Sequence, residues 1–190
     1  MTVLAGQYVV ETAIGPIGIA WTGRGLCRVC LPEGDRAATE RRLARLAPAD
    51  CMTVTNVAAL PRWVARLADD IGRYAQGSTV DFSYVPLDLA GIPPFRLAIY
   101  RAAFQLGFGE TVTYGELAAW AGHEGEARQT GQALGANPLP LVVPCHRILA
   151  AGRKIGGFSA PGGTATKQAM LALEGIDLTP PPPAQASFAF

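Results

Sequence analysis

The sequence predicts a two-part α/β protein with a sheet-containing N-terminal half and a helical C-terminal half. Residues 7–31 alternate apolar and polar positions and are interrupted by Gly-Pro and Gly-Arg-Gly, which is typical of antiparallel strands joined by tight turns. The stretch LAGIPP near residue 90 breaks the pattern, and beyond it apolar residues recur at helical spacing. We therefore expect one domain over 1–90 and a second over 91–175.

Two amphipathic helices and one short strand are expected to complete the N-terminal half. Helical periodicity covers about 35–47 and 60–76. The segment VDFSYV at 80–85 has the composition of a strand, and we expect it to close this half.

Helical patterns fill the C-terminal half. Thr113 followed three residues later by Glu116 is the signature of a capping box at a helix start. The expected helices are 95–106, 114–121, 126–135 and 164–174. Beyond them the proline-rich segment 176–190 is expected to be a disordered tail.

The second and third of these helices form a candidate helix-turn-helix, because a glycine-containing turn joins them. In the third helix Ala127, Gly131 and Gly135 recur every four residues and leave one face nearly bare. A bare face permits close approach of either a neighbouring helix or a DNA backbone, and the spacing leaves both open. Arg128 beside this face is, by itself, no more than a solvated surface arginine.

Composition sets broad limits on function. The chain has 190 residues, 49% of them hydrophobic, and a net charge of +1, which is ordinary for a globular protein and neither requires nor excludes a nucleic-acid partner. We see no secretory signal and no apolar run long enough to span a membrane. The four cysteines are scattered and do not resemble a disulfide framework, so we expect a cytoplasmic protein.

A cysteine and a histidine stand side by side in PLVVPCHRILAAG, residues 140–152. The preceding apolar run favours a buried, inert thiol. His146, the turn-forming Pro144 and the following glycine-rich loop instead favour a nucleophile, since a thiolate at neutral pH needs a base or a positive neighbour. Neighbouring side chains point in opposite directions, so a bridging water is expected between Cys145 and His146. A carboxylate must then orient the imidazole, and Glu174 is a candidate.

Cys27 and Cys30 form a C-x-x-C pair, which elsewhere marks zinc or redox sites. In a strand, an offset of three residues places the two side chains on opposite faces. Both histidines of the chain lie far away in sequence. We therefore favour two core thiols and expect no metal site.

The C-terminal half resembles the O6-alkylguanine-DNA alkyltransferases. The family's Pro-Cys-His-Arg signature stands at 144–147, and TYGELA, an Ala-Arg pair, NP, GGFS and K…LALEG surround it in the family's order and spacing. The resemblance covers about residues 95–175. The N-terminal half matches only in architecture, and for it the resemblance implies a ribonuclease-H-like fold with no activity of its own.

The resemblance implies a chemical role for four positions. Cys145 is the alkyl acceptor. His146 is the base, acting through a water, and Glu174 is the carboxylate that orients it. Asn137 ties the helix-turn-helix to the active-site turn.

Further positions are implied to recognise the damaged base. Tyr114 rotates the phosphate and then donates a hydrogen bond to the flipped guanine. Ser159 and the carbonyl groups of Cys145 and Ile148 read the guanine edge, and Pro140 forms an apolar wall.

The implied DNA contact is a recognition helix in the minor groove. Arg128 is the finger that enters the duplex, and the small residues Ala127 and Gly131 allow close approach. Gln129 departs from the small residue that is usual on this face, and Phe158 stands where the family often has tyrosine. The FSAPGG loop is also longer than the commoner form, which leaves the tolerated alkyl size open.

The implied function is direct-reversal DNA repair. The protein transfers an alkyl group, chiefly methyl, from O6-alkylguanine, and by extension O4-alkylthymine, to its own cysteine in one irreversible turnover with base flipping. Neither a cofactor nor a metal is expected. The expected partner is double-stranded DNA containing O6-alkylguanine, with no membrane partner, and the expected state is a monomer, with cooperative assembly on DNA left open.

Two other functions compete with this interpretation. A lesion sensor or helix-turn-helix regulator would keep its function when Cys145 is replaced by alanine. A Cys-His hydrolase would turn over repeatedly on a small molecule or peptide, although adjacent Cys145 and His146 make a direct hydrogen bond awkward.

Overall fold

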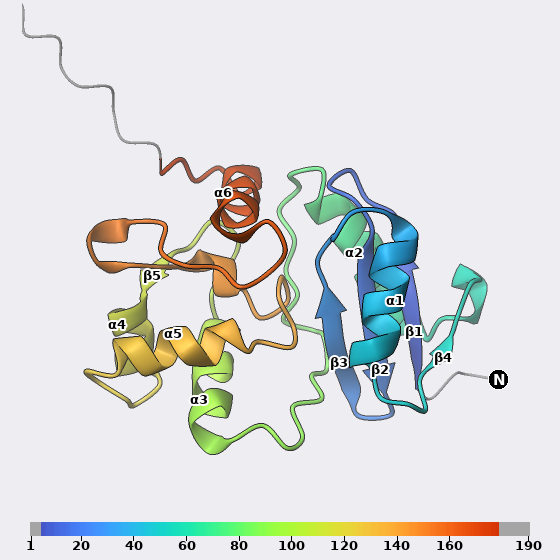
Figure 1. The fold of residues 1–190 in the computed structure, drawn as a ribbon, viewed down its shortest axis with the longest axis horizontal. Coiled ribbons are helices and arrows are strands. Elements are labelled where there is room, and N and C mark those ends of the chain that lie inside the picture. The colour runs from blue at the N-terminus through green and yellow to red at the C-terminus, as the bar shows by residue number, and fades with distance from the viewer. Residues whose placement is uncertain (1–4, 179–190) are drawn as a thin grey trace, which may run out of the picture.

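The computed structural model describes residues 5–178 and places a sheet with flanking helices beside a helical half (Figure 1). The architecture is mixed α/β, as predicted. Of the predicted tail, residues 179–190 lie outside the described part of the chain, as do residues 1–4.

A four-stranded sheet with the order β3-β2-β1-β4 forms the centre of the N-terminal half. Its strands are β1 (Gly6–Val10), β2 (Ile17–Thr22), β3 (Gly25–Cys30) and β4 (Met52–Thr53). The first three are antiparallel neighbours, as predicted, whereas the short β4 pairs with β1 in parallel. Gly25, with φ of 143°, is required at the start of β3, because an added Cβ would collide with the Pro86 carbonyl.

Two helices cover opposite faces of this sheet (Figure 1). Helix α1 (Arg36–Leu46) is capped by the Asp35 side chain, which accepts from the Ala38 amide at 2.8 Å, and packs Leu43 against Val9 and Ala20. Helix α2 (Arg62–Tyr74), which follows the 3-10 turn η1 (Val57–Ala59), lies behind the sheet in this view and packs into the main core.

The strand predicted at 80–85 does not form, so that prediction is wrong. The Asp81 side chain accepts from the amide and hydroxyl of Ser83 at 2.8 and 2.7 Å and turns the chain. Phe82 and its apolar neighbours are buried as an irregular segment of the core. Pairing resumes only as an isolated parallel bridge between Leu26 and Leu87.

The C-terminal half contains the predicted helices, with ends displaced by a few residues. The predicted capping box is confirmed: the Thr113 hydroxyl accepts from the Glu116 amide at 3.2 Å, and Glu116 accepts from the Thr113 amide at 2.6 Å. The elements are α3 (Pro94–Ala103), β5 (Val112–Thr113), α4 (Tyr114–Trp120), α5 (Ala127–Gly135), η2 (Cys145–Arg147), β6 (Ile148–Leu149), η3 (Ala151–Arg153) and α6 (Gly163–Leu173). Strands β5 and β6 pair in parallel.

The two halves share one hydrophobic core. It includes Ile19 and Leu67 from the sheet half as well as Ile99, Leu117 and Val143 from the helical half. A backbone hydrogen bond of 2.9 Å also joins the Val29 amide of β3 to the Pro138 carbonyl. The sheet half therefore helps to position the segment that leads into Cys145.

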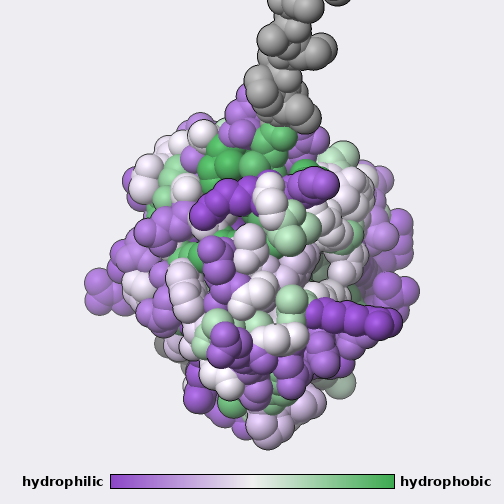
Figure 2. Space-filling view, turned by 90° about the vertical axis from the view of Figure 1, so that its left-hand side faces the viewer, coloured by the Kyte–Doolittle hydropathy of each residue, from purple (hydrophilic) through white to green (hydrophobic). Residues whose placement is uncertain are grey.

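The surface that carries α4 and η3 is mostly hydrophilic. Figure 2 shows this end of the molecule, on which hydrophilic residues predominate and the main hydrophobic area lies at the top of the view. In the part of the chain that the structure describes, no helix combines the length and apolar character needed to span a membrane.

Candidate active site

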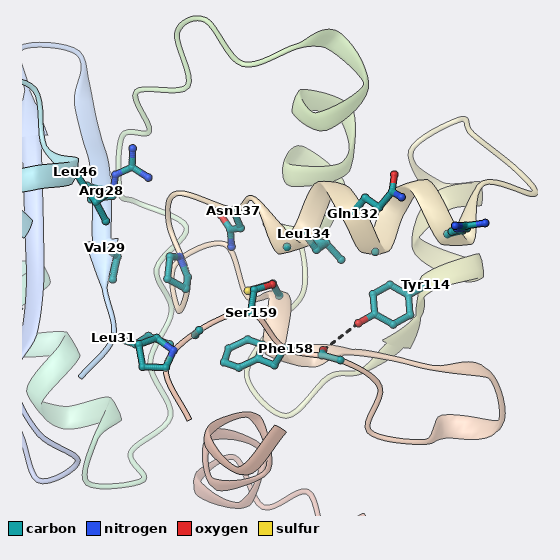
Figure 3. Close-up of a pocket in the computed structure, with 18 of the residues that line it drawn as sticks. Arg28, Val29, Leu31, Leu46, Tyr114, Gln132, Leu134, Asn137, Phe158 and Ser159 are labelled. Atoms are coloured by element: carbon teal, nitrogen blue, oxygen red, sulfur yellow. Dashed lines mark hydrogen bonds between the residues drawn. The ribbon is translucent and has the colours of Figure 1, made fainter. Parts of the chain in front are cut away.

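Cys145 lines a cavity of about 690 Å³ at the junction of the two halves (Figure 3). One wall comes from β3 and α1 and includes Arg28, Leu31 and Leu46, and the other comes from α5 and the loop after η3. The cavity brings together most of the residues that the sequence singled out, namely Tyr114, Ala127, Arg128, Gly131, Asn137, Pro140, Cys145, Phe158 and Ser159.

Four predicted residues do not line this cavity. Gln129 lies on the exposed side of α5. Ile148 is fully buried in β6, and its carbonyl already accepts from the Lys167 ammonium at 2.5 Å. His146 and Glu174 are buried behind Cys145, where they belong to a polar network rather than to the cavity wall.

The segment before Cys145 is held by Asn137, which follows the end of α5. Its side-chain amide donates to the Val143 carbonyl at 2.8 Å, and its oxygen accepts from the Leu139 amide at 3.0 Å. These bonds stabilise a compact turn in which Leu141 has a φ of 76°. Asn137 therefore fixes the path of the chain from the helix to the thiol.

The Cys145 thiol is buried, with 8% of its surface exposed. Burial raises its pKa, while a hydrogen bond from Asn137 and the charge of Lys167 act in the opposite direction without reversing the shift. The resting side chain is therefore a neutral thiol at neutral pH, and a nucleophilic reaction requires a base to remove its proton.

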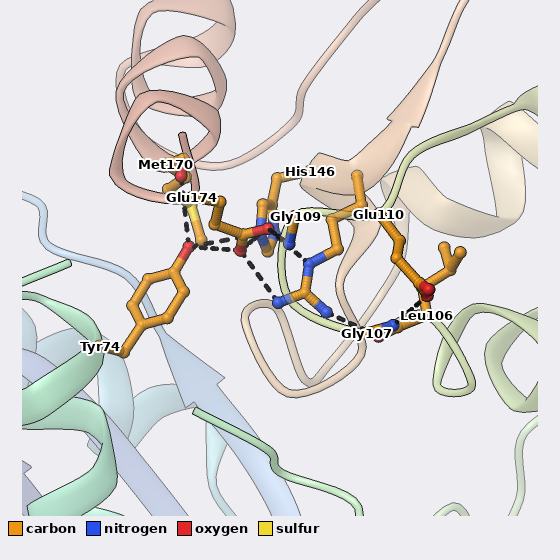
Figure 4. A network of polar contacts seen from close by, with 9 residues as sticks. Tyr74, Leu106, Gly107, Gly109, Glu110, His146, Met170 and Glu174 are labelled. Atoms are coloured by element: carbon orange, nitrogen blue, oxygen red, sulfur yellow. Dashed lines mark hydrogen bonds and ion pairs between the residues drawn. The ribbon is translucent and has the colours of Figure 1, made fainter. Parts of the chain in front are cut away.

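His146 is fully buried beside that thiol in η2. Its Nε2 lies 2.7 Å from Glu174 Oε1 (Figure 4), and its Nδ1 is buried and makes no hydrogen bond to any described residue. Burial lowers the pKa of His146, and the opposing effect of Glu174 is smaller. The imidazole is therefore neutral, with its proton on Nε2 facing the carboxylate and a free lone pair on Nδ1.

Glu174, which caps the C-terminal end of α6, is ionised at neutral pH. Arg147 donates to both carboxylate oxygens, at 2.8 and 3.0 Å, and the Gly109 amide donates to Oε2 at 3.0 Å. Burial alone would raise its pKa, but the hydrogen bonds from His146 and Arg147 and the charge of Arg147 outweigh burial and hold the pKa of Glu174 at about 2. The acceptor of the His146 proton is thus a fixed, fully charged carboxylate.

Lys167 is a buried residue of this site that the sequence analysis did not single out. Its ammonium donates to the carbonyls of Ile148 and Gly157, and within the described range it forms no ion pair with a carboxylate. Burial lowers its pKa to about 8. Lys167 joins β6 to the glycine-rich loop. The sequence could have pointed to Lys167 as a site residue, because it is one of only two lysines in the chain and stands in the K…LALEG stretch.

The candidate DNA-contacting residues lie together on α5. Arg128 and Gln129 are exposed, and Ala127 and Gly131 are partly buried. Gly131 lies over the Tyr114 ring, whose hydroxyl donates to the Gly157 carbonyl at 3.3 Å. The two short helices α4 and α5 thus present a small-residue face and an arginine at the edge of the cavity.

Cys27 and Cys30 do not lie on opposite faces of the sheet, so that expectation is wrong. A β-bulge where Ala20 and Trp21 pair with β3 changes the alternation, and both thiols pack against the cluster beneath α1. All four cysteines are free. Among residues 5–178, no group of three or more His, Cys, Asp or Glu side chains is placed to hold a metal ion.

Comparison with known proteins identifies relatives of both halves. Residues 94–176 match the family model described as the DNA binding domain of 6-O-methylguanine DNA methyltransferase. The methylated-DNA–protein-cysteine methyltransferase of Methanothermobacter thermautotrophicus is 31% identical over 162 residues, which are 85% of this chain and 81% of that protein. The protein of the same name from Mycolicibacterium paratuberculosis is 41% identical over 114 residues, 60% of this chain and 67% of that protein.

Solved structures show the same arrangement. The crystal structure of Mycobacterium tuberculosis O6-methylguanine methyltransferase aligns with a TM-score of 0.68 and 29% identity, covering 90% of this chain and 92% of that one. The structure of Mycobacterium tuberculosis OGT in complex with DNA aligns with a TM-score of 0.69 and 30% identity, covering 89% and 92%.

Proposed function

Because this chain belongs to the methylated-DNA–protein-cysteine methyltransferase family, we propose that Cys145 accepts the alkyl group from O6 of guanine in DNA. The resemblance seen in the sequence is confirmed, and the protein is a methylated-DNA–protein-cysteine methyltransferase that repairs DNA by alkyl transfer. The observation that carries the assignment of Cys145 is its position between an open cavity and the buried His146–Glu174 pair.

The chemistry follows from the protonation states of that pair. Nδ1 of His146 takes the Cys145 proton through a bridging water, and Glu174 stabilises the imidazolium that forms. The thiolate attacks the alkyl carbon in line, so an S–C bond forms as the C–O6 bond breaks. The bonding electrons leave with guanine O6, and the purine takes up a proton. The product is a thioether that no neighbouring group can cleave, which makes the transfer a single turnover.

The cavity walls supply recognition of the base. Tyr114 stands at the α5 side and is placed to donate a hydrogen bond to an extruded guanine, after moving away from the Gly157 carbonyl. Ser159 and the backbone of Cys145 read the guanine edge, while Pro140 and Phe158 bound the space for the alkyl group. The carbonyl of Ile148, which accepts from Lys167, is buried away from the cavity and would reach the guanine only after a rearrangement. In thymine alkylated at O4 the bond to break is likewise between the alkyl carbon and an exocyclic oxygen of the base, with O4 leaving as part of thymine, so we include it as a substrate.

The DNA duplex lies across α5 in this proposal. The helices α4 and α5 act as a helix-turn-helix whose face at Ala127 and Gly131 enters the minor groove, and Gln129 contacts the groove edge. The complex of the Mycobacterium tuberculosis relative with DNA supports DNA as the partner. In this proposal the domain assigned to 1–90 is ribonuclease-H-like, and the domain assigned to 91–175 binds DNA and carries the acceptor. The protein acts on each lesion as a monomer, in the cytoplasm.

Incubation with a duplex that carries one O6-methylguanine is expected to add a single methyl group, about 14 Da, to the protein because the thioether cannot be cleaved. Intact-mass spectrometry and peptide mapping should place the added mass on Cys145, with the reaction stopping at one equivalent. An unmodified duplex is the control. Tight lesion binding without a mass gain would favour a sensor, and repeated turnover would favour a hydrolase.

Arg128→Ala is expected to slow transfer from duplex DNA by about tenfold to a hundredfold, because an extruded base loses the side chain that fills its place in the stack. Transfer from free O6-methylguanine should change less than twofold, since no stack is present. Single-turnover rates on both substrates check this, with the exposed Arg101→Ala on α3 as the control. Equal losses on both substrates would contradict the finger role.

A further inference from the structure

Tyr74 brings the sheet half into direct contact with the catalytic network (Figure 4). It is the last residue of α2 and is fully buried. Its hydroxyl lies 2.9 Å from Glu174 Oε1, across 100 positions of sequence, and 3.4 Å from His146 Nε2. Glu174 is ionised and can only accept, so the tyrosine is the donor.

Core packing does not account for the hydroxyl group. The Tyr74 ring packs against Phe82, Phe108 and the His146 imidazole, with ring centroids 6.3, 6.1 and 6.4 Å away. A phenylalanine would make these contacts equally well and would avoid burying a polar atom. What the tyrosine adds at this position is its 2.9 Å hydrogen bond to the carboxylate, since its other acceptor, the Met170 carbonyl, lies farther away at 3.5 Å.

The hydrogen bond from Tyr74 is made to the Glu174 carboxylate, which influences the protonation state of His146. Glu174 Oε1 accepts from the imidazole, from Arg147 at 3.0 Å and from Tyr74. Of the charged groups that influence His146, Glu174 favours the imidazolium, while Arg147 and Lys167 favour the neutral ring. A third donor on Oε1 spreads the negative charge of the carboxylate and weakens the interaction with Glu174 that favours protonation of His146.

We propose that Tyr74 is a positioning residue for alkyl transfer, whose hydroxyl fixes Glu174 and keeps His146 neutral with Nδ1 free to accept the thiol proton. This inference rests on the proposed function, in which His146 is the base. It gives the sheet half a part in the chemistry, through one hydrogen bond that reaches the catalytic carboxylate from α2.

The test is the pH dependence of single-turnover transfer in Tyr74→Phe. Without the hydroxyl, Glu174 stabilises the imidazolium more strongly, so the acid limb of the rate profile should move to higher pH by about half a unit to one unit. On the acid limb itself, below the pKa of His146 in the wild type, the rate should fall about threefold to tenfold, while the plateau at high pH should stay within about twofold. A merely structural role would lower the rate equally at every pH.

Tyr84→Phe is the matched control. Tyr84 also donates to a carboxylate of α2, Asp70, at 2.8 Å, and that carboxylate is ion-paired with Arg73, but neither tyrosine nor carboxylate touches His146. This variant should keep the wild-type pH profile even where its unfolding midpoint is lowered. The wild-type protein is assayed first, so a failure of the proposed function is seen as absent transfer before any variant is compared.

A second variant keeps the test independent of folding losses. Insertion of 3-fluorotyrosine at position 74 retains the ring and the hydroxyl but makes the hydroxyl a stronger donor, so the acid limb should move to lower pH. Opposite shifts in the two variants support the proposal. Wild-type transfer combined with an unmoved acid limb in the fluorotyrosine variant would overturn it, whether or not Tyr74→Phe folds.

Discussion

Cys145→Ala is expected to abolish alkyl transfer while leaving binding to lesion-containing DNA within about threefold of wild type. The sulfur of Cys145 is the atom of the protein that bonds to the alkyl carbon in the proposed reaction, and an alanine methyl group has no nucleophilic electron pair. Because the side chain is small and borders a cavity, the stability loss should be about 1 kcal/mol. Intact mass after incubation measures transfer, and fluorescence anisotropy with a labelled O6-methylguanine duplex measures binding.

Cys27→Ala is the matched control for this variant. Cys27 is a partly buried free thiol under α1, and burial raises its pKa to about 12, so it stays protonated and inert. The Cys27→Ala variant should therefore transfer the alkyl group to Cys145 at the wild-type rate. Residual mass gain in Cys145→Ala would place the acceptor elsewhere, and intact lesion-dependent function without any transfer would revive the sensor interpretation.

Glu174→Gln is expected to slow transfer by about a hundredfold to a thousandfold, since it removes the charge that stabilises the imidazolium. It also leaves the buried Arg147 guanidinium without its counter-ion, which should cost about 3 to 5 kcal/mol of unfolding free energy. Single-turnover kinetics and denaturant unfolding measure the two effects. Glu110→Gln is the control, because Glu110 accepts a backbone amide at 2.7 Å but is exposed. A folded variant with near-normal transfer would contradict the role of Glu174.

The lowered pKa of Glu174 also determines how the free energy of unfolding should depend on pH. The pKa of Glu174 is lowered from 4.5 to about 2 in the folded protein, so the folded state binds fewer protons than the unfolded chain in this range. Its contribution of about 3 kcal/mol is complete above pH 4.5 and is lost as the pH falls toward 2. Unfolding free energies measured across this range should decline steeply in the wild type and more shallowly in Glu174→Gln.

Local signals in the sequence predicted the elements that depend on local physics. The capping box at Thr113 and Glu116 specifies the start of α4 through bonds three residues apart, and the alternation in 7–31 specifies the antiparallel strands. Cys145 and His146 were recognisable because they are adjacent in one short stretch of chain, whereas the role of Asn137 was implied only by the family resemblance. In the structure the turn that Asn137 stabilises leads directly into η2, which contains Cys145 and His146.

Contacts between distant segments could not be predicted in the same way. The hydrogen bond from Tyr74 to Glu174 joins residues 100 positions apart, and no periodicity in α2 distinguishes this tyrosine from a core aromatic. Strand β4 is too short to carry an alternation pattern, and it exists because β1 offers a free edge. The 80–85 segment has strand composition, but the Asp81 turn and burial of its apolar side chains decide its structure.

The shared core has a consequence for how much damage a cell can repair. If each molecule reacts once, as proposed above, repair capacity equals the number of folded, unreacted copies and cannot be raised by faster turnover. Ile19 and Leu67 in the sheet half belong to the same core as Val143 beside the acceptor turn, so a cavity-forming substitution there lowers the folded fraction of the whole chain. A destabilising substitution far from Cys145 would thus lower the number of folded molecules, while each molecule that does fold keeps full activity.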